Sequence, residues 1–175
     1  MPSASSALLV LAAPVIAFAG PAAPTPLKVT SAAFLPNGAI PADFACGGSG
    51  GSPPLAWSGV PGDAKTVAIL VDDPDAERGV FTHWLITGIK PAITSVAAGD
   101  PPPDGAVSAS NDDGGAGYLG PCPASGRHRY FFRVFALDTS LDAPATETRE
   151  AFLAAARGHI VGQGELIGTY QKQSR

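Results

Sequence analysis

Apolar and polar side chains alternate from His128 to Leu137, and this period of two predicts a β-strand. One face of the strand carries His128, Tyr130, Phe132, Val134 and Ala136. The other face carries Arg129, Phe131, Arg133, Phe135 and Leu137. The first face is apolar except at its beginning. We therefore expect its two polar residues to lie together at one end of a buried row, where a binding pocket can form.

Four other segments also show strand patterns. Residues 65–72 (KTVAILVD) form a nearly continuous apolar run, which predicts a strand buried on both faces. Residues 27–34 and 81–89 predict two more strands, and residues 165–170 (ELIGTY) predict a short closing strand. In the strand at 81–89, the alternation puts one set of side chains on a common face: His83, Leu85, Thr87 and Ile89.

A helix is expected only at residues 147–157 (ETREAFLAAAR). Thr146 or Thr148 is the expected cap at its start, and Gly158 suits its end. Two loops rich in glycine and proline are predicted at residues 46–57 (CGGSGGSPPLAW) and 97–116. The whole pattern predicts a mainly β domain with one or two helices late in the chain.

The first 20 residues are small and apolar, and they contain Ala17-Phe18-Ala19, which resembles the cleavage site of a secretory signal. We expect residues 1–19 to be a signal peptide, 20–26 a linker, and 27–175 a single exported domain, periplasmic or secreted. The alternative is a flexible apolar tail on a cytoplasmic protein. No other segment reaches the roughly 18 apolar residues of a membrane span, so no integral membrane segment is expected in the mature chain.

Charge argues against one class of partner. The 175 residues carry a net charge of −4, and only 15% of them are charged. Sequence-independent binding to nucleic acid requires a basic face, and no local cluster of Lys and Arg provides one. Nucleic acid is therefore not an expected partner.

The two cysteines, Cys46 and Cys122, allow two interpretations. In an exported protein a disulfide between them is expected, because oxidising compartments preserve such bonds. The alternative is a pair of buried free thiols. Neither belongs to the Cys-x-x-Cys pattern of redox or zinc sites.

Two further patterns suggest enzymatic or metal chemistry. GGSGG at 47–51 matches the Gly-x-Ser-x-Gly motif of serine hydrolases, but that motif requires a strand before the serine and a helix after it. Here Ser-Pro-Pro follows instead. The histidines His83, His128 and His159 are widely spaced, whereas zinc ligands usually come in close pairs. We expect no cofactor and no metal; a metal site built from two of these histidines is the less favoured alternative. We interpret His159 as a packing or capping residue.

Asp73 and Asp75 flank a proline directly after the predicted strand at 65–72. Asp-Pro favours a turn, and this role alone explains them. However, carboxylates near the edge of a core need partners, and a histidine N–H is a natural one. An Asp–His contact orients the imidazole and favours its protonated form, which binds anions.

Two long blocks of the sequence resemble the phosphatidylethanolamine-binding proteins. Residues 71–89 (VDDPDAERGVFTHWLITGI) resemble the family block Asp-Pro-Asp-Ala…His-Trp, and residues 117–138 (GYLGPCPASGRHRYFFRVFALD) resemble its Gly-Tyr-x-Gly-Pro-Cys-Pro-Pro…Gly-x-His-Arg-Tyr block. SPPLAW at 52–57 and GHIVGQGELIGTY at 158–170 are similar to the bacterial branch, often called Raf-kinase-inhibitor-like proteins. The resemblance covers about residues 27–170.

The resemblance implies a β-sandwich with Greek-key connections and peripheral helices at the C-terminal end. It also implies an anion pocket at one end of the sandwich, formed by Asp73, His83, Gly120, Pro121, His128 and Tyr130, with Trp84 as a nearby wall. Three positions depart from the family pattern: Glu77 and Ala124 replace prolines, and GGSGG replaces the commoner Asp-Gly-Glu-Asn loop.

The expected function is non-enzymatic binding of a small anionic or phosphorylated group, such as phosphate or a phospholipid headgroup. One alternative is inhibition of a kinase or protease through protein–protein contacts, as relatives are described. A less favoured alternative is a hydrolytic or metal-assisted enzyme that uses His83, His128 and Asp73.

Overall fold

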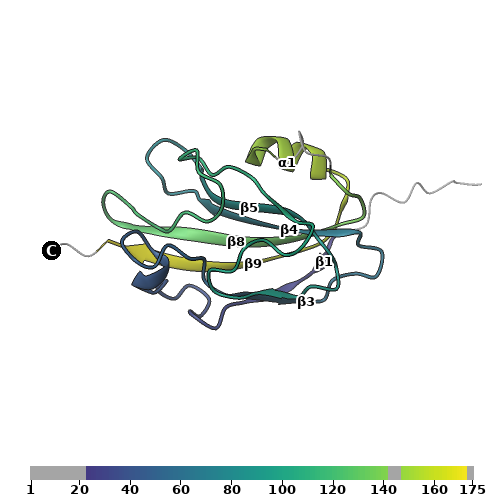
Figure 1. The fold of residues 1–175 in the computed structure, drawn as a ribbon, viewed down its shortest axis with the longest axis horizontal. Helices are drawn as coiled ribbons and strands as arrows, with labels where there is room; N and C mark the ends of the chain where they lie inside the picture. Colours follow the sequence, from purple (N-terminus) through teal and green to yellow (C-terminus); the bar gives the residue numbers. More distant parts are fainter. Residues whose placement is uncertain (1–22, 142–146, 173–175) are drawn as a thin grey trace, which may run out of the picture.

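Two β-sheets packed face to face form the body of the protein in the computed structural model, which describes residues 23–141 and 147–172 (Figure 1). The larger sheet contains, in spatial order, β1 (Thr25–Pro26), β9 (Ile160–Gln171), β8 (Arg127–Leu137), β4 (Thr66–Asp73), β5 (Phe81–Ile89) and β7 (Val107–Ser108). The smaller sheet contains β2 (Lys28–Thr30), β3 (Leu55–Ser58) and β6 (Ser95–Val96). A short 3₁₀ helix, η1 (Ala42–Phe44), and one α-helix, α1 (Arg149–Ala156), complete the described chain. The mainly β class and the sandwich are confirmed.

The larger sheet separates two hydrophobic cores, because its central strand is apolar on both faces. Val67, Ile69 and Val71 of β4 pack toward the smaller sheet, and Ala68 and Leu70 pack toward α1. Figure 1 shows the same three layers, with α1 on one side of the larger sheet and β3 on the other. Each fully buried aliphatic side chain contributes roughly 1.5–3 kcal/mol. Burial on both faces thus explains the continuous apolar run in the sequence.

Strand β8 follows the predicted alternation. Its inward residues Tyr130, Phe132, Val134 and Ala136 are all buried between the sheets. On the other face, Phe135 and Leu137 pack in the core beneath α1. His128 begins the inward row and is the only member of that row that is not fully buried.

Strand β5 departs from the predicted alternation. Val71 pairs with Trp84 while Asp72 pairs with Thr82, so β5 contains one residue, His83, that has no counterpart in β4. A second register shift lies farther along the strand, where Ile89 returns to the core between the sheets although Leu85 packs beneath α1. The expectation that His83, Leu85, Thr87 and Ile89 share one face was therefore wrong, because an extra residue inverts the alternation.

Several strand assignments also change. Only Lys28–Thr30 of the strand expected at 27–34 forms β2, and β7 lies within the loop expected at 97–116. Residues 55–58, expected in a loop, form β3, and Thr25–Pro26, at the end of the expected linker, pair with β9. Strand β9 spans Ile160–Gln171 rather than residues 165–170 alone. Its first half contains Gly162 and Gly164, where a Cβ atom would lie 3.0 and 2.2 Å from other atoms of the fold. Glycine here permits close packing, but it removes the side-chain pattern that reveals a strand.

Helix α1 has Thr148, one of the two expected residues, as its N-terminal cap. The Thr148 side chain accepts a hydrogen bond from the Ala151 N–H at 3.2 Å. Arg149 then reaches the buried Asp72 at 3.2 Å, and Arg133 reaches the same carboxylate oxygen at 2.5 Å. Burial raises the pKa of Asp72, while the two guanidinium groups lower it. The ion pairs thus join α1 to the end of β4.

Some expectations fall outside the described residues, namely the signal peptide at 1–19 and the alternative cap Thr146. Within the described part of the chain, no helix is both long enough and apolar enough to cross a membrane.

A disulfide joins Cys46, just after η1, to Cys122, 76 positions later in the chain, with 5.2 Å between the two Cα atoms. The backbones of the two segments also meet, because the Cys46 N–H donates to the Pro121 carbonyl at 3.0 Å. The bond therefore closes a long loop that includes β3, β4 and β5.

Removing this disulfide should lower the free energy of unfolding by about 4 kcal/mol, the chain-entropy estimate for a loop of this size. Urea denaturation of the wild-type protein, with and without reductant, measures the loss. The Cys46→Ala/Cys122→Ala variant is the control, since it should match the reduced wild type and show no response to reductant. Equal stability of the oxidised and reduced wild type would contradict the prediction.

Candidate functional site

The end of β4 lies between the beginnings of β5 and β8, because β4 pairs antiparallel with both neighbours. An open cavity of about 840 Å³ lies at this place. Five residues expected at the site line it: Asp73, His83, Gly120, His128 and Tyr130. We call this space, with those five residues, the strand-end cavity.

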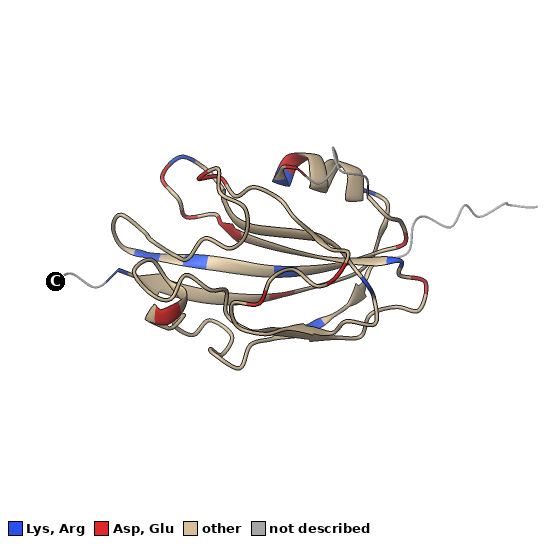
Figure 2. Cartoon of the chain, in the orientation of Figure 1, with Lys and Arg blue, Asp and Glu red and all other residues tan. Residues whose placement is uncertain are grey.

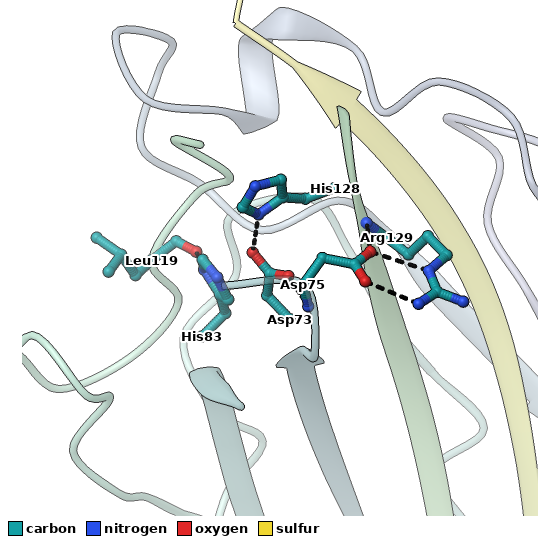
Figure 3. A network of polar contacts seen from close by, with 6 residues as sticks. All are labelled: Asp73, Asp75, His83, Leu119, His128 and Arg129. Carbon is teal, nitrogen blue, oxygen red and sulfur yellow. Dashed lines mark hydrogen bonds and ion pairs between the residues drawn. The ribbon is translucent and has the colours of Figure 1, made fainter. Parts of the chain in front are cut away.

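Asp73 fixes the orientation of His128 (Figure 3). Its Oδ2 accepts a hydrogen bond from the His128 Nδ1–H at 2.7 Å, and the two side chains are 5% and 13% exposed. The other carboxylate oxygen accepts the backbone N–H of Asp75 at 2.8 Å. Both oxygens are therefore engaged, and the imidazole is held with its Nε2 atom on the side away from the carboxylate.

His83 enters the same cavity because of the extra residue in β5. Its Nδ1 lies 2.7 Å from the carbonyl oxygen of Leu119, and its ring packs edge-on against Tyr130 with 5.1 Å between ring centroids. Burial lowers the pKa of His83, against the opposite effects of the Leu119 carbonyl and the Asp73 charge. The neutral imidazole is thus favoured.

Tyr130 is a buried side chain with an unused polar group. The residue is 1% exposed, and its hydroxyl makes no hydrogen bond of acceptable geometry with any described residue. Burial, and then the negative charge of Asp73, raises the pKa of Tyr130, so the phenol keeps its proton. Buried polar groups usually have partners, and the group within reach of this hydroxyl is the Asp73 carboxylate, whose side-chain interaction also raises the pKa of Tyr130.

The loop around Gly120 forms one wall of the strand-end cavity. The Leu119 N–H donates to the His83 carbonyl at 2.9 Å, which ties the loop to β5. Gly120 lies so close to η1 that a Cβ atom would be 2.8 Å from the Phe44 carbonyl oxygen. The disulfide holds the same wall, since Cys46 and Cys122 both line the cavity.

Two residues expected at or beside the site are not among the residues that line the strand-end cavity. Pro121 is not among the residues lining the strand-end cavity, and its carbonyl accepts from Cys46. Trp84 packs edge-on against Tyr118, with ring centroids 5.6 Å apart, and lines a smaller cavity of about 260 Å³ next to the first. Trp84 and His83 are adjacent at the register shift in β5, but the Trp84 ring contacts Tyr118 whereas the His83 ring contacts Tyr130.

Several lining residues were not expected from the sequence. Arg78, Asp112, Asp113 and Tyr118 all border the strand-end cavity, and Glu77, noted only as a departure, borders it too. Asp112 is positioned by its contact with β5, where it accepts the Thr82 N–H at 2.7 Å. The adjacent aspartates of the long loop were the only signal for it in the sequence.

Asp75 ties the turn after β4 to the beginning of β8. Arg129 donates to its two oxygens from Nε at 2.9 Å and Nη2 at 2.7 Å, as Figure 3 shows. These hydrogen bonds lower the pKa of Asp75 to about 2. Asp75 therefore supports the turn that carries Asp73, and does not itself border the cavity.

The charged residues visible in Figure 2 are few and are spread over strands and loops, with no extended basic area in that view. Among the described residues, no group of three His, Cys, Asp or Glu side chains is arranged to hold a metal ion. Ser49 of the GGSGG segment is exposed and donates to the Asp43 carbonyl at 3.1 Å.

Comparison with known proteins gives a consistent result. Residues 30–171 match the family model described as phosphatidylethanolamine-binding protein. The chain is 47% identical to a UPF0098 protein of Methanothermobacter thermautotrophicus over 150 residues, covering 83% of this chain and 99% of that protein. It is 39% identical to a Mycobacterium tuberculosis protein named as lipoprotein LppC, covering 83% of this chain and 73% of that protein. A crystal structure of a phosphatidylethanolamine-binding protein homologue from Chlamydia trachomatis has a TM-score of 0.79 at 38% identity, covering 85% and 99% of the two chains.

Gly120→Ala should lower the free energy of unfolding by roughly 1–3 kcal/mol, as overpacking does, because its Cβ would meet backbone atoms of η1. Gly62→Ala is the matched control, since a Cβ at Gly62 would have no atom within 4 Å. Urea denaturation of both variants measures the difference. Equal stability of the two variants would show that the loop can move away from η1 without cost.

His83 should titrate below its ordinary pKa of 6.5 in the folded protein. The unfolded chain then binds more protons than the folded one between the two values, so the contribution of His83 to stability falls as pH decreases through this window. NMR titration of the His83 ring measures its pKa. Urea denaturation of wild type and His83→Gln across the same range isolates the stability effect, which would be absent if His83 titrated at 6.5.

Proposed function

The chain belongs to the phosphatidylethanolamine-binding protein family, and from this premise we propose that it is a non-enzymatic protein that binds a small anionic or phosphorylated group in the strand-end cavity. The 2.7 Å hydrogen bond between Asp73 and His128 carries the proposal. It holds the imidazole so that Nε2 can donate to an anion when the ring carries a second proton. Hydrogen bonds to charged groups are stronger than neutral ones, at roughly 1.5–3 kcal/mol.

Two neighbouring groups add to this capacity. The Tyr130 hydroxyl is buried and has no partner among the described residues, so an anion oxygen can accept its proton in a hydrogen bond. His83 lies against the Tyr130 ring and borders the same cavity. Three polar groups from β5 and β8 thus face one space, which suits a phosphate-like group with several oxygens.

Enzymatic activity has less support than binding. A hydrolase of the serine type needs a nucleophile within hydrogen-bond reach of a base. Among the described residues, no serine, threonine or cysteine side chain forms a hydrogen bond with His83, His128 or His159, and Ser49 bonds to a backbone carbonyl. No surface of the described residues specifically supports inhibition of a kinase or protease through protein contacts.

Export is part of the proposal. The apolar segment that contains Ala17-Phe18-Ala19 supports it, as does the disulfide, which oxidising compartments preserve. The name of the mycobacterial relative, a lipoprotein, is in agreement.

His128→Ala should weaken anion binding by roughly tenfold to a hundredfold without unfolding the protein, because one charge-assisted hydrogen bond is lost. Isothermal titration with phosphorylethanolamine measures the affinity. His159→Ala is the matched control, since His159 also pairs with an aspartate, Asp138 at 2.8 Å, but is half exposed and does not border the strand-end cavity.

Asp73→Asn should weaken binding in the same assay, because the neutral amide replaces the negatively charged group that accepts the hydrogen bond from His128. Wild-type affinity in both His128→Ala and Asp73→Asn would sink the proposed role of this pair. A loss of similar size in His159→Ala would show that the effect is not specific to the cavity.

A further inference from the structure

The hydrogen bonds of His83 determine what its free nitrogen can do. A backbone carbonyl only accepts hydrogen bonds, so the 2.7 Å contact with Leu119 requires a proton on Nδ1. In a neutral imidazole the other nitrogen, Nε2, then has a lone pair and is an acceptor. His83 Nε2 forms no hydrogen bond with any residue in the described part of the chain, and the side chain borders the strand-end cavity.

The hydrogen bonds of His128 also show which of its ring nitrogens carries a proton, but they give its Nε2 atom a different role. An ionised carboxylate only accepts hydrogen bonds, so the contact with Asp73 Oδ2 requires a proton on His128 Nδ1. The Nε2 atom of His128 becomes a donor when the ring takes a second proton, next to a carboxylate that compensates the charge. The Tyr130 hydroxyl is a second donor. The cavity therefore presents donors from β8 opposite an acceptor from β5.

The charged groups that face these rings make the cavity unusual for an anion site. Four carboxyl groups border it: Asp73, Glu77, Asp112 and Asp113. Arg78 is the one guanidinium among the lining residues. Asp72 and Asp75 lie just behind the lining, each paired with arginine, and the Tyr118 hydroxyl donates to the Phe44 carbonyl at 3.0 Å. Such surroundings oppose a doubly charged ligand and favour the presence of a proton.

We propose that the strand-end cavity selects anions that carry an acidic proton, and that this proton lies between an anion oxygen and Nε2 of His83. The ligand class is the singly charged form of a phosphate monoester or of inorganic phosphate. Its P–OH group donates to His83, and its other oxygens accept from His128 and Tyr130. This inference deepens the proposed function and rests on it. The lowered pKa of His83 is in agreement, because it keeps the ring an acceptor at neutral pH.

A phosphate diester provides the sharpest contrast. It has the same single charge and similar oxygens, but no proton of its own. At neutral pH it meets the lone pair of His83, so the imidazole must first take a proton from solvent. The two ligand sources, a free phosphate monoester and the diester of an intact lipid headgroup, are thus distinguished by one hydrogen atom.

Isothermal titration with methyl phosphate and dimethyl phosphate at pH 7.5 and 5.5 tests the inference. At pH 7.5 we expect dimethyl phosphate to bind several-fold more weakly than methyl phosphate, because buried His83 is harder to protonate than the methyl phosphate dianion, whose second pKa is about 6. The ratio should shrink at pH 5.5, where His83 is more readily protonated. Titration in two buffers of different ionisation enthalpy should show uptake of about one proton with either ligand at pH 7.5, because methyl phosphate is mainly dianionic there. At pH 5.5, below the second phosphate pKa of about 6, the uptake should mostly disappear for methyl phosphate but persist for dimethyl phosphate.

Nitrogen-15 NMR of the wild-type histidine rings locates that proton without any variant. His83 Nε2 should stay unprotonated with methyl phosphate bound and become protonated with dimethyl phosphate bound. His159 is the internal control, because its ring pairs with Asp138 outside the cavity and should respond to neither ligand. A His83 ring that is protonated with both ligands at pH 7.5 overturns the inference.

His83→Gln provides the matched variant, because its amide does not titrate and can donate to the diester or accept from the monoester at either pH. The preference for methyl phosphate over dimethyl phosphate should disappear in it, and binding of dimethyl phosphate should depend less on pH between 7.5 and 5.5 than in the wild type. Equal affinity of the wild type for both ligands at pH 7.5, without proton uptake, overturns the inference and leaves the proposed function standing. Absence of binding for both ligands at either pH overturns the proposed function as well.

Discussion

The pairing of β4 with neighbours on both edges is the constraint on which the rest of the structure depends. Hydrogen bonds to β5 and β8 saturate its backbone, and apolar packing covers both of its faces. Polar side chains can therefore occur only where the strand ends. Asp72 and Asp73 lie there and point to opposite faces: one binds the arginines that hold α1, and the other binds His128 at the cavity. Two adjacent residues thus serve the fold and the site.

The sequence predicted those features that depend on local periodicity. The alternation in β8 correctly placed His128 in the inward row, directly before the buried residues that begin with Tyr130. The apolar run in β4 correctly predicted a strand buried on both faces. The contact of Asp73 with a histidine was also expected, because a carboxylate at the end of such a strand needs a partner. The family resemblance supplied the pocket residues that the pattern could not.

Features that depend on register or on distant backbone contacts were not predictable. A single extra residue in β5 moves His83 onto the face of Tyr130, and nothing in FTHWLITGI marks it. The glycines of β9 hide a strand because close contact with Leu27 replaces side-chain packing. Asp112 reaches the cavity through a hydrogen bond to β5, thirty positions earlier in the chain. Such placements follow from the assembled sheet and not from neighbouring residues.

The short strand β1 has a geometric consequence for how the molecule faces any surface to which it is attached. Thr25 pairs with Gly162, which lies beside Ala136, eight residues along β8 from His128. At about 3.3 Å per residue, the two ends are separated by about 26 Å. A tether attached ahead of Thr25 would therefore hold the sandwich by the end opposite the cavity. The cavity would open away from the surface, toward solutes rather than toward the molecules of that surface.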